Sequence, residues 1–225
     1  MKQLLLDIQP APTPSLDNFV PGRNTELLAA LRTLPNGEQG KRSLYVWGLP
    51  GSGRTHLLHA AIALFRQQGL KAEYTSGKGD WDTLSACDVV ALDDVETLDE
   101  AAQIALFNLF NGLRETGKAL IVAGPCAPME LPLRDDLKTR LGWGLVYQAQ
   151  ALTDTEKSEA LQHHAAERGF RLPKEVTDYL LRHVRRDLPS LMAMLDALDK
   201  WSLTAKKPVT VALLRQLLRI PPKRE

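Results

Sequence analysis

The sequence predicts an α/β domain built on a five-stranded parallel sheet, followed by a small domain made only of helices. From residue 16 to residue 150, short apolar runs typical of buried strands alternate with helical patterns, which favours a parallel sheet covered on both faces. From Ala151 onward only helical periodicity remains. We therefore expect three parts: a leading peptide and linker over 1–15, a core over 16–150 and a helical domain over 151–225.

The expected strands are apolar runs bounded by turn residues, and the expected helices of the core lie between them. The strands cover residues 43–47, 72–75, 89–92, 119–123 and 144–147. The helices cover residues 26–33, 55–68, 100–116 and 133–139.

The helical domain is expected to begin with a capping box, in which Thr153 and Glu156 occupy the reciprocal positions. We expect this first helix to end near Arg168, because Gly169 follows it. Apolar residues then recur every three or four positions, which predicts further helices over 174–184, 188–200 and 211–218.

The composition excludes several classes of protein. The 225 residues carry 28 basic and 27 acidic side chains, so a formal charge of +1 gives no general attraction for nucleic acid. Two cysteines cannot form a disulfide framework, and no apolar run is long enough to cross a membrane. We expect a soluble cytoplasmic protein without a membrane partner.

A glycine-rich stretch, Gly-Leu-Pro-Gly-Ser-Gly-Arg-Thr, follows the first strand and leads into the next helix. Glycines let backbone N–H groups surround a phosphate, and the helix N-terminus adds partial positive charge. The predicted phosphate-binding residues are Gly48, Pro50, Gly51, Ser52, Gly53, Arg54 and Thr55. Because Arg54 stands where this motif has lysine, we expect nucleotide binding with little or no hydrolysis. A loop that keeps its fold without a nucleotide is the alternative.

Two carboxylates follow the third expected strand, at the edge where open α/β sheets bind ligands. Asp93 is expected to meet Mg²⁺ through water, and Asp94 to polarise an attacking water. The hydroxyl of Thr55 is expected to reach the same Mg²⁺ directly.

These motifs, with three further stretches, resemble the DnaA-like branch of the AAA+ ATPases. The stretches are residues 17–24, residues 140–144 (Arg-Leu-Gly-Trp-Gly) and, in the helical part, residues 152–154 with 168–173, and the resemblance covers residues 16–220. Within this branch the chain is similar to the Hda-type regulatory inactivators of DnaA, since it ends at Glu225 where DnaA continues into a DNA-binding domain.

The resemblance implies an AAA+ core that binds ADP or ATP, ADP being favoured, and a helical lid. It adds Phe19, Val20 and His56 to the nucleotide site. It also implies that Arg140 is an arginine finger, a cation inserted into a neighbour's site to stabilise phosphoryl transfer. Trp143, three residues later, is expected to pack within the fold.

The resemblance implies two protein partners, DnaA and the sliding clamp, which is the β subunit of DNA polymerase III. The clamp-binding peptide would consist of Gln3, Leu4, Leu6 and Asp7, carried on a proline-rich linker. DNA would be reached through the clamp, and assembly into a homo-oligomer is left open.

Three departures from the family pattern bear on the chain's own hydrolysis. Arg54 is the first. The second is that residues 121–125 (Ile-Val-Ala-Gly-Pro), Ala123 among them, have no polar side chain where the family has a polar residue that senses the γ-phosphate. The third is Pro189, which occupies the place of a second sensing arginine, unless Arg185 or Arg186 substitutes for it.

We therefore expect a negative regulator of DNA replication initiation that binds the clamp and stimulates hydrolysis of DnaA-bound ATP, with no independent activity. One alternative is a DnaA-like or helicase-loader-type ATPase acting at the replication origin. Another is a DNA-binding module, using the basic residues Arg182, Arg185, Arg186, Lys206 and Lys207.

Overall fold

The computed structural model describes residues 13–38, 42–185 and 187–218, which fall into two compact units. One unit runs from Thr13 to Ala151, and the other begins at Leu152. The predicted peptide at Gln3, Leu4, Leu6 and Asp7 lies outside the described residues.

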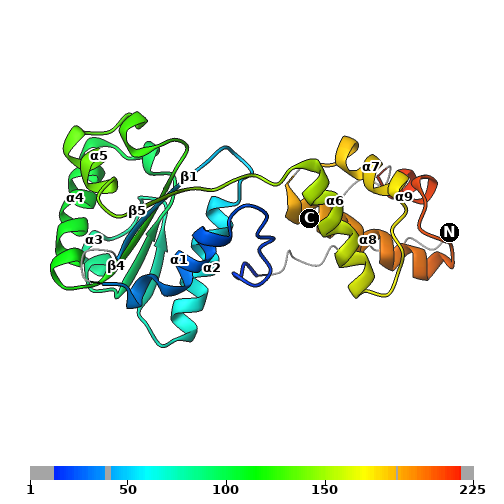
Figure 1. Cartoon of the computed structure of the whole chain (residues 1–225), viewed down its shortest axis with the longest axis horizontal. Helices are drawn as coiled ribbons and strands as arrows, with labels where there is room; N and C mark the ends of the chain where they lie inside the picture. Colours follow the sequence, from blue (N-terminus) through cyan, green and yellow to red (C-terminus); the bar gives the residue numbers. More distant parts are fainter. Residues whose placement is uncertain (1–12, 39–41, 186, 219–225) are drawn as a thin grey trace. The chain divides into compact units, whose positions relative to one another are not determined.

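The first unit contains a parallel sheet of five strands in the order β2-β3-β4-β1-β5 (Figure 1). The strands are β1 Ser43–Trp47, β2 Ala72–Thr75, β3 Val89–Leu92, β4 Ala119–Gly124 and β5 Leu145–Gln148. The predicted sheet is confirmed, and every strand lies within one residue of its expected bounds. Since all five strands run the same way, their carboxyl ends share one edge of the sheet.

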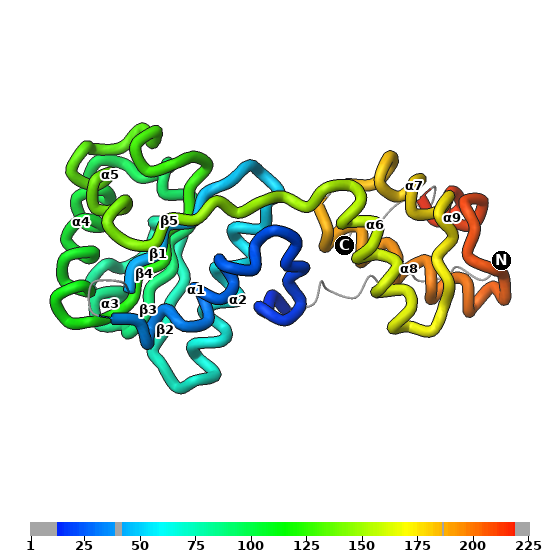
Figure 2. The backbone as a smooth tube through the Cα atoms, viewed as in Figure 1, coloured from blue at the N-terminus to red at the C-terminus, as the bar shows by residue number. Residues whose placement is uncertain are grey.

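Helices cover both faces of this sheet, as Figures 1 and 2 show. One face packs against α1 Thr25–Thr33 and α2 Arg54–Gln67, and the other against α3 Trp81–Ser85, α4 Glu100–Glu115 and α5 Asp135–Leu141. Successive strand residues alternate between the two layers. In β1, Leu44 and Val46 belong to the first core and Tyr45 to the second.

Two helices differ from the expectations. The short α3 was not expected, because its five residues carry too little periodicity; its signal is Asp80, which caps the helix by accepting from the Asp82 N–H at 3.1 Å. The helix expected over 133–139 is α5, which starts at Asp135 and ends at Leu141, so Arg140 lies in its last turn.

Among its described residues, the second unit has four helices around a core of their own (Figure 2). They are α6 Asp154–Glu167, α7 Lys174–His183, α8 Leu188–Ala205 and α9 Val211–Leu218. The Thr153–Glu156 capping box is present, with Thr153 N–H donating to Glu156 Oε2 at 2.7 Å. α8 runs five residues beyond its expected end and stops where Lys206 turns left-handed.

Within the described ranges, no helix has both the length and the apolar character needed to cross a membrane.

Candidate functional site

The loop after β1 has the backbone of a phosphate cradle. Gly51 and Gly53 have φ of 82° and 90°, a left-handed region that favours glycine, and the Ser52 N–H donates to the Leu49 carbonyl at 3.0 Å. Gly53 then caps α2, whose first hydrogen bond runs from Leu57 N–H to the Gly53 carbonyl at 2.9 Å. The helix therefore points its N-terminus at the loop.

Two polar atoms of the loop are buried without a hydrogen-bond partner in the described part of the chain. They are Ser52 Oγ, on a side chain that is 4% exposed, and one terminal guanidinium nitrogen of Arg54. A hydroxyl and a guanidinium are the groups that bind phosphate oxygens, and leaving them unpaired costs free energy. Their chemistry fits a bound phosphate.

Phe19 lies against the loop. A Cβ placed on Gly53 would approach Cε2 of Phe19 to 2.7 Å, and the ring centroid of Phe19 is 5.5 Å from that of His56. His56 Nε2 lies 3.1 Å from the Ser15 carbonyl, and burial lowers the pKa of its imidazole. The structure thus brings Phe19 and His56 to the loop; Val20 is half-buried, and Thr55 is exposed in the first turn of α2.

The two carboxylates after β3 have different surroundings. Asp93 is 1% exposed; its Oδ2 accepts from the Tyr74 hydroxyl at 3.2 Å and its Oδ1 from the Asp94 N–H at 3.0 Å. Burial and the neighbouring carboxylate raise the pKa of Tyr74 to about 12. Asp94 is exposed and left-handed, with φ of 50°. Only β4 separates β3 from β1, so both carboxylates lie on the edge that carries the loop.

A tyrosine hydroxyl lies beside Gly124, in the stretch 121–125 at the end of β4. A Cβ on Gly124 would overlap the hydroxyl of Tyr45, which donates to the Cys126 carbonyl at 2.8 Å. Burial raises the pKa of Tyr45 well above its usual value. The neighbouring Ala123 is completely buried. Residue 124 therefore has no room for a side chain.

In the second unit, Pro189 lies in the first turn of α8. Asp187 caps this helix by accepting from the Ser190 N–H at 2.9 Å, and Arg185 lies 3.5 Å from the same carboxylate. Arg186 lies outside the described residues.

Arg140 lies at the opposite edge of the sheet from the loop. It precedes β5, whose Leu145 pairs with Leu44 near the start of β1, whereas the loop follows the end of β1. The guanidinium carbon of Arg140 is 3.7 Å from the ring centroid of Trp143. Trp143 is 49% exposed, so the expectation that it packs within the fold was wrong in part.

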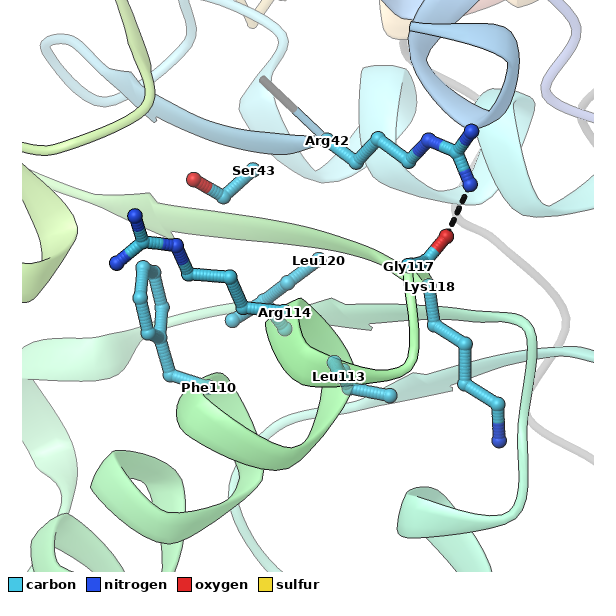
Figure 3. Close-up of a pocket in the computed structure, with 8 residues that line it drawn as sticks. All are labelled: Arg42, Ser43, Phe110, Leu113, Arg114, Gly117, Lys118 and Leu120. Atoms are coloured by element: carbon cyan, nitrogen blue, oxygen red, sulfur yellow. Dashed lines mark hydrogen bonds between the residues drawn. The ribbon is translucent and has the colours of Figure 1, made fainter. Parts of the chain in front are cut away.

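A small cavity of about 20 Å³ lies at this same edge, between β1, β4 and α4 (Figure 3). It has room for about one water molecule. In Figure 3 the guanidinium of Arg42 turns toward the Gly117 carbonyl, to which it donates. Lys118 donates to the Ser85 carbonyl at 3.0 Å. These cations do not converge on the cavity, so it is no nucleotide site.

Comparison with known families explains why these features occur together. The family model described as Hda, lid domain matches residues 154–218, and the model described as bacterial DnaA ATPase domain matches residues 75–148. The chain is an Hda-like protein. A DnaA-like core followed by an Hda-type lid supports a DnaA-related regulator that acts in DNA replication.

Solved structures share the AAA+ fold of this Hda-like chain. Domain III of DnaA from Thermotoga maritima has a TM-score of 0.71 at 24% identity, over 94% of this chain and 98% of that one. A DnaA bound to AMPPCP and single-stranded DNA has a TM-score of 0.72 at 24% identity, over 87% and 68%. A RuvB variant from Thermotoga maritima has a TM-score of 0.65 at 18% identity, over 94% and 72%.

Sequence reasoning missed three residues of these sites in the Hda-like chain. Tyr74 and Tyr45 reach Asp93 and the Gly124 position from neighbouring strands, and strand pairing gives no local signal. Arg114 reaches Trp143 from α4, with its guanidinium carbon 4.9 Å from the ring centroid. Among the described residues, no group of three or more His, Cys, Asp or Glu side chains is arranged to hold a metal ion.

Proposed function

We propose that this Hda-like chain binds an adenine nucleotide at the phosphate loop, with ADP favoured over ATP. Support comes from the unpaired buried atoms of Ser52 and Arg54, which a phosphate would satisfy, and from the two left-handed glycines. The backbone of 48–53 would bind the phosphates, with Phe19, Val20 and His56 beside it and Pro50 in the loop. Thr55 and Asp93 would hold Mg²⁺, which neutralises phosphate charge.

The bound nucleotide would stabilise the fold rather than turn over. Asp94 is placed to polarise water, but the Gly124 position offers no polar side chain and the Tyr45 hydroxyl fills the space. Pro189 has no donor for a γ-phosphate. An AAA+ site without these sensing groups has little means of detecting or promoting ATP hydrolysis, so we propose no independent ATPase activity.

We propose that Arg140 acts in trans, on ATP held by DnaA. The observation that carries this is its position: five residues of extended β1, about 15 Å, separate the edge that carries Arg140 from the chain's own phosphate loop. Its guanidinium has no carboxylate partner among the described residues. A cation that cannot reach its own nucleotide and is not neutralised is available to a partner's phosphates.

The peptide of Gln3, Leu4, Leu6 and Asp7 would bind the sliding clamp, so that the chain meets DnaA on newly replicated DNA. Glutamine can hydrogen-bond at a pocket rim, and the two leucines can serve as apolar anchors. The chain would then be a negative regulator of replication initiation, because conversion of DnaA-bound ATP to ADP lowers the supply of active initiator.

The test measures conversion of ATP to ADP on purified DnaA with clamp-loaded DNA. We expect the wild-type chain to accelerate conversion and Arg140→Ala to lose at least about a thousand-fold of that acceleration, the lower range for an arginine finger. Arg134→Ala is the matched control, because Arg134 lies just before the same helix but is paired with Asp136 at 2.9 Å. If the clamp brings the chain to DnaA, Gln3→Ala should also lose the acceleration of ATP conversion on clamp-loaded DNA.

The outcomes separate the alternatives. Turnover by the chain alone, abolished by Asp94→Asn, would identify a DnaA-like or loader-type ATPase. Tight salt-dependent binding to naked DNA would favour a DNA-binding module. An unchanged rate for Arg140→Ala would refute the finger.

Nucleotide binding is tested separately by thermal unfolding. ADP at a hundred times its dissociation constant should stabilise the fold by about 2.7 kcal/mol, and Arg54→Ala should remove this shift. No shift with ADP or ATP in the wild-type chain would refute the nucleotide site without touching the role of Arg140.

A further inference from the structure

Two arginines from different helices meet on one indole ring at the amino edge of the sheet. The guanidinium carbon of Arg140, from α5, lies 3.7 Å from the ring centroid of Trp143, and that of Arg114, from α4, lies 4.9 Å from it. Arg140 also lies 5.3 Å from the ring centroid of Phe107. Figure 3 shows Arg114 turned away from Arg42 and Lys118, toward the side of Phe110.

The other cations around α5 are neutralised, whereas these two are not. Arg134 pairs with Asp136 at 2.9 Å, and Lys138 pairs with Asp135 at 2.7 Å. Neither Arg114 nor Arg140 forms an ion pair with any described residue; each has only ring contacts. The two arginines therefore lie together with their charges uncompensated by carboxylates.

Such an arrangement needs a reason, because two like charges held near one another repel. The negative face of the indole ring offsets part of this repulsion. Stacking also fixes the plane of a guanidinium while leaving its edge N–H donors available. A stacked arginine is thus ordered without being neutralised, and it keeps the donors that bind phosphate oxygens.

The exposure of Trp143 points the same way. A tryptophan that is 49% exposed contributes less to a core than its size allows, yet here its ring contacts both arginines. Val146, nearby on β5, is 40% exposed and has no such contact among those the structure gives. It provides a reference position on the same edge strand.

We propose that Trp143 is a positioning residue, which holds the Arg140 side chain ordered for the phosphates of ATP on the partner. Arg114, on the same indole ring, is a second cation of this site. The inference rests on the proposed role of Arg140 in trans. Arg140 touches the reacting phosphates, Trp143 acts through Arg140, and Arg114 attracts the phosphate charge. The role of residue 143 then depends on the π face of its ring and not on the volume of its side chain.

The test is single-turnover conversion of ATP on DnaA with clamp-loaded DNA, measured over a range of concentrations of the full-length chain. Trp143→Ala should lower the maximal rate about ten-fold, which lies between the values for an exposed and a desolvated cation–π contact, and Trp143→Phe should recover most of it. Trp143→Leu keeps bulk without a π face and should behave like Trp143→Ala. Arg114→Ala should mainly raise the half-saturating concentration. This increase should be larger at low salt than at high salt, because salt screens the attraction that Arg114 provides in the wild type.

Val146→Ala is the matched control and should retain the wild-type rate. A wild-type maximal rate for both Trp143→Ala and Trp143→Leu, with Arg140→Ala inactive, would overturn the positioning role and leave the proposed function standing. A wild-type rate for Arg140→Ala would overturn the proposed function and this inference with it.

A second measurement does not depend on activity or on DnaA. In the free chain, the side-chain Nε–H resonances of Arg114 and Arg140 should be shifted by the ring current of Trp143. Both should return toward their solvent-exposed positions in Trp143→Leu, while the backbone spectrum of the sheet stays unchanged. Resonances that do not move would overturn the stacking on which the inference stands.

Discussion

The hydroxyl of Tyr74 donates a hydrogen bond to Oδ2 of Asp93 across 3.2 Å, joining β2 to the end of β3. Asp93 is 1% exposed, and its other oxygen accepts from the Asp94 N–H. The buried carboxylate expected to bind Mg²⁺ through water is thus fixed by groups from its own protein. Tyr74 is a part of the site that holds this carboxylate in place.

This contact predicts a pH dependence of stability in the alkaline range. The folded-state pKa of Tyr74 is raised from 10.0 to about 12, so between these values the unfolded chain loses a proton that the folded chain retains. The contribution is therefore complete below pH 10 and is lost as the pH rises toward 12. Urea unfolding should show a steeper loss of stability over this range in the wild type than in Tyr74→Phe. Equal slopes would contradict the assignment.

Gly53 should be more sensitive to substitution than Gly51, although both are left-handed glycines of one loop. A Cβ on Gly51 meets nothing within 4 Å, so Gly51→Ala should cost only the backbone strain, about 1–2 kcal/mol. A Cβ on Gly53 would also lie 2.7 Å from Cε2 of Phe19, so Gly53→Ala should cost more. Denaturant titration of both variants measures the difference.

The double variant Phe19→Ala with Gly53→Ala separates strain from contact. If the ring of Phe19 causes the extra cost, the two substitutions together should destabilise by less than the sum of their separate effects. Strict additivity would show that Phe19 does not limit the loop.

Most of the fold could be predicted from the sequence because its signals are local. The strand Val89–Leu92 is a buried apolar run followed by two carboxylates, and the helix from Arg54 begins where the glycines end. The Thr153–Glu156 capping box marks the start of the lid within four residues. Each of these features depends on neighbours in the chain, so a single sequence contains what is needed.

The candidate sites were less predictable, because they depend on contacts between distant residues. Tyr45 and Gly124 meet only because β1 pairs with β4, and Arg114 meets Trp143 across 29 positions in sequence. The single-residue identities of Gly124 and Pro189 suggested missing sensing groups. They gave no indication that a tyrosine hydroxyl fills the first of those places.

The pair of Tyr45 and Gly124 should behave as one packing unit. Tyr45→Phe removes the hydroxyl that donates to the Cys126 carbonyl at 2.8 Å and should cost about 1 kcal/mol. Gly124→Ala would force its Cβ against that hydroxyl, and overpacking of this kind costs about 1–3 kcal/mol. Removing the hydroxyl makes room, so the double variant should be less destabilised than the two single variants added together. Additive effects, measured by urea unfolding, would contradict the contact.

The same geometry predicts that a polar sensing residue cannot simply be restored. Gly124→Asp should lower stability without creating ATPase activity in the isolated chain, because the Tyr45 hydroxyl and Cγ1 of Val95, 3.1 Å from the added Cβ, leave no space for it. The measurement is ATP turnover by a variant that still melts cooperatively. Turnover well above the wild-type level would contradict this, because it would show that the site lacks only the polar side chain and that there is room for one at residue 124.

In the lid, Asp196 of α8 should be the most important charged residue for stability. Its Oδ1 lies 2.8 Å from His164 Nε2 and 2.9 Å from a guanidinium nitrogen of Arg168, so one carboxylate connects α8 to two side chains from the end of α6. All three are at least two-thirds buried, which reduces solvent screening. Asp196→Asn should cost about 1–2 kcal/mol, since it removes the charge while keeping the shape.

Asp199 provides the matched control for this lid contact, because it lies 3.8 Å from Arg168 and has no contact with His164 among those the structure gives. Asp199→Asn should therefore cost less than Asp196→Asn. Hydrogen exchange of the amides in α6 and α8 measures both effects within the lid, and faster exchange should appear there in Asp196→Asn while the sheet is unchanged. A larger effect for Asp199→Asn would contradict this ranking, which rests on the shorter distance from Asp196 to Arg168 and on its contact with His164.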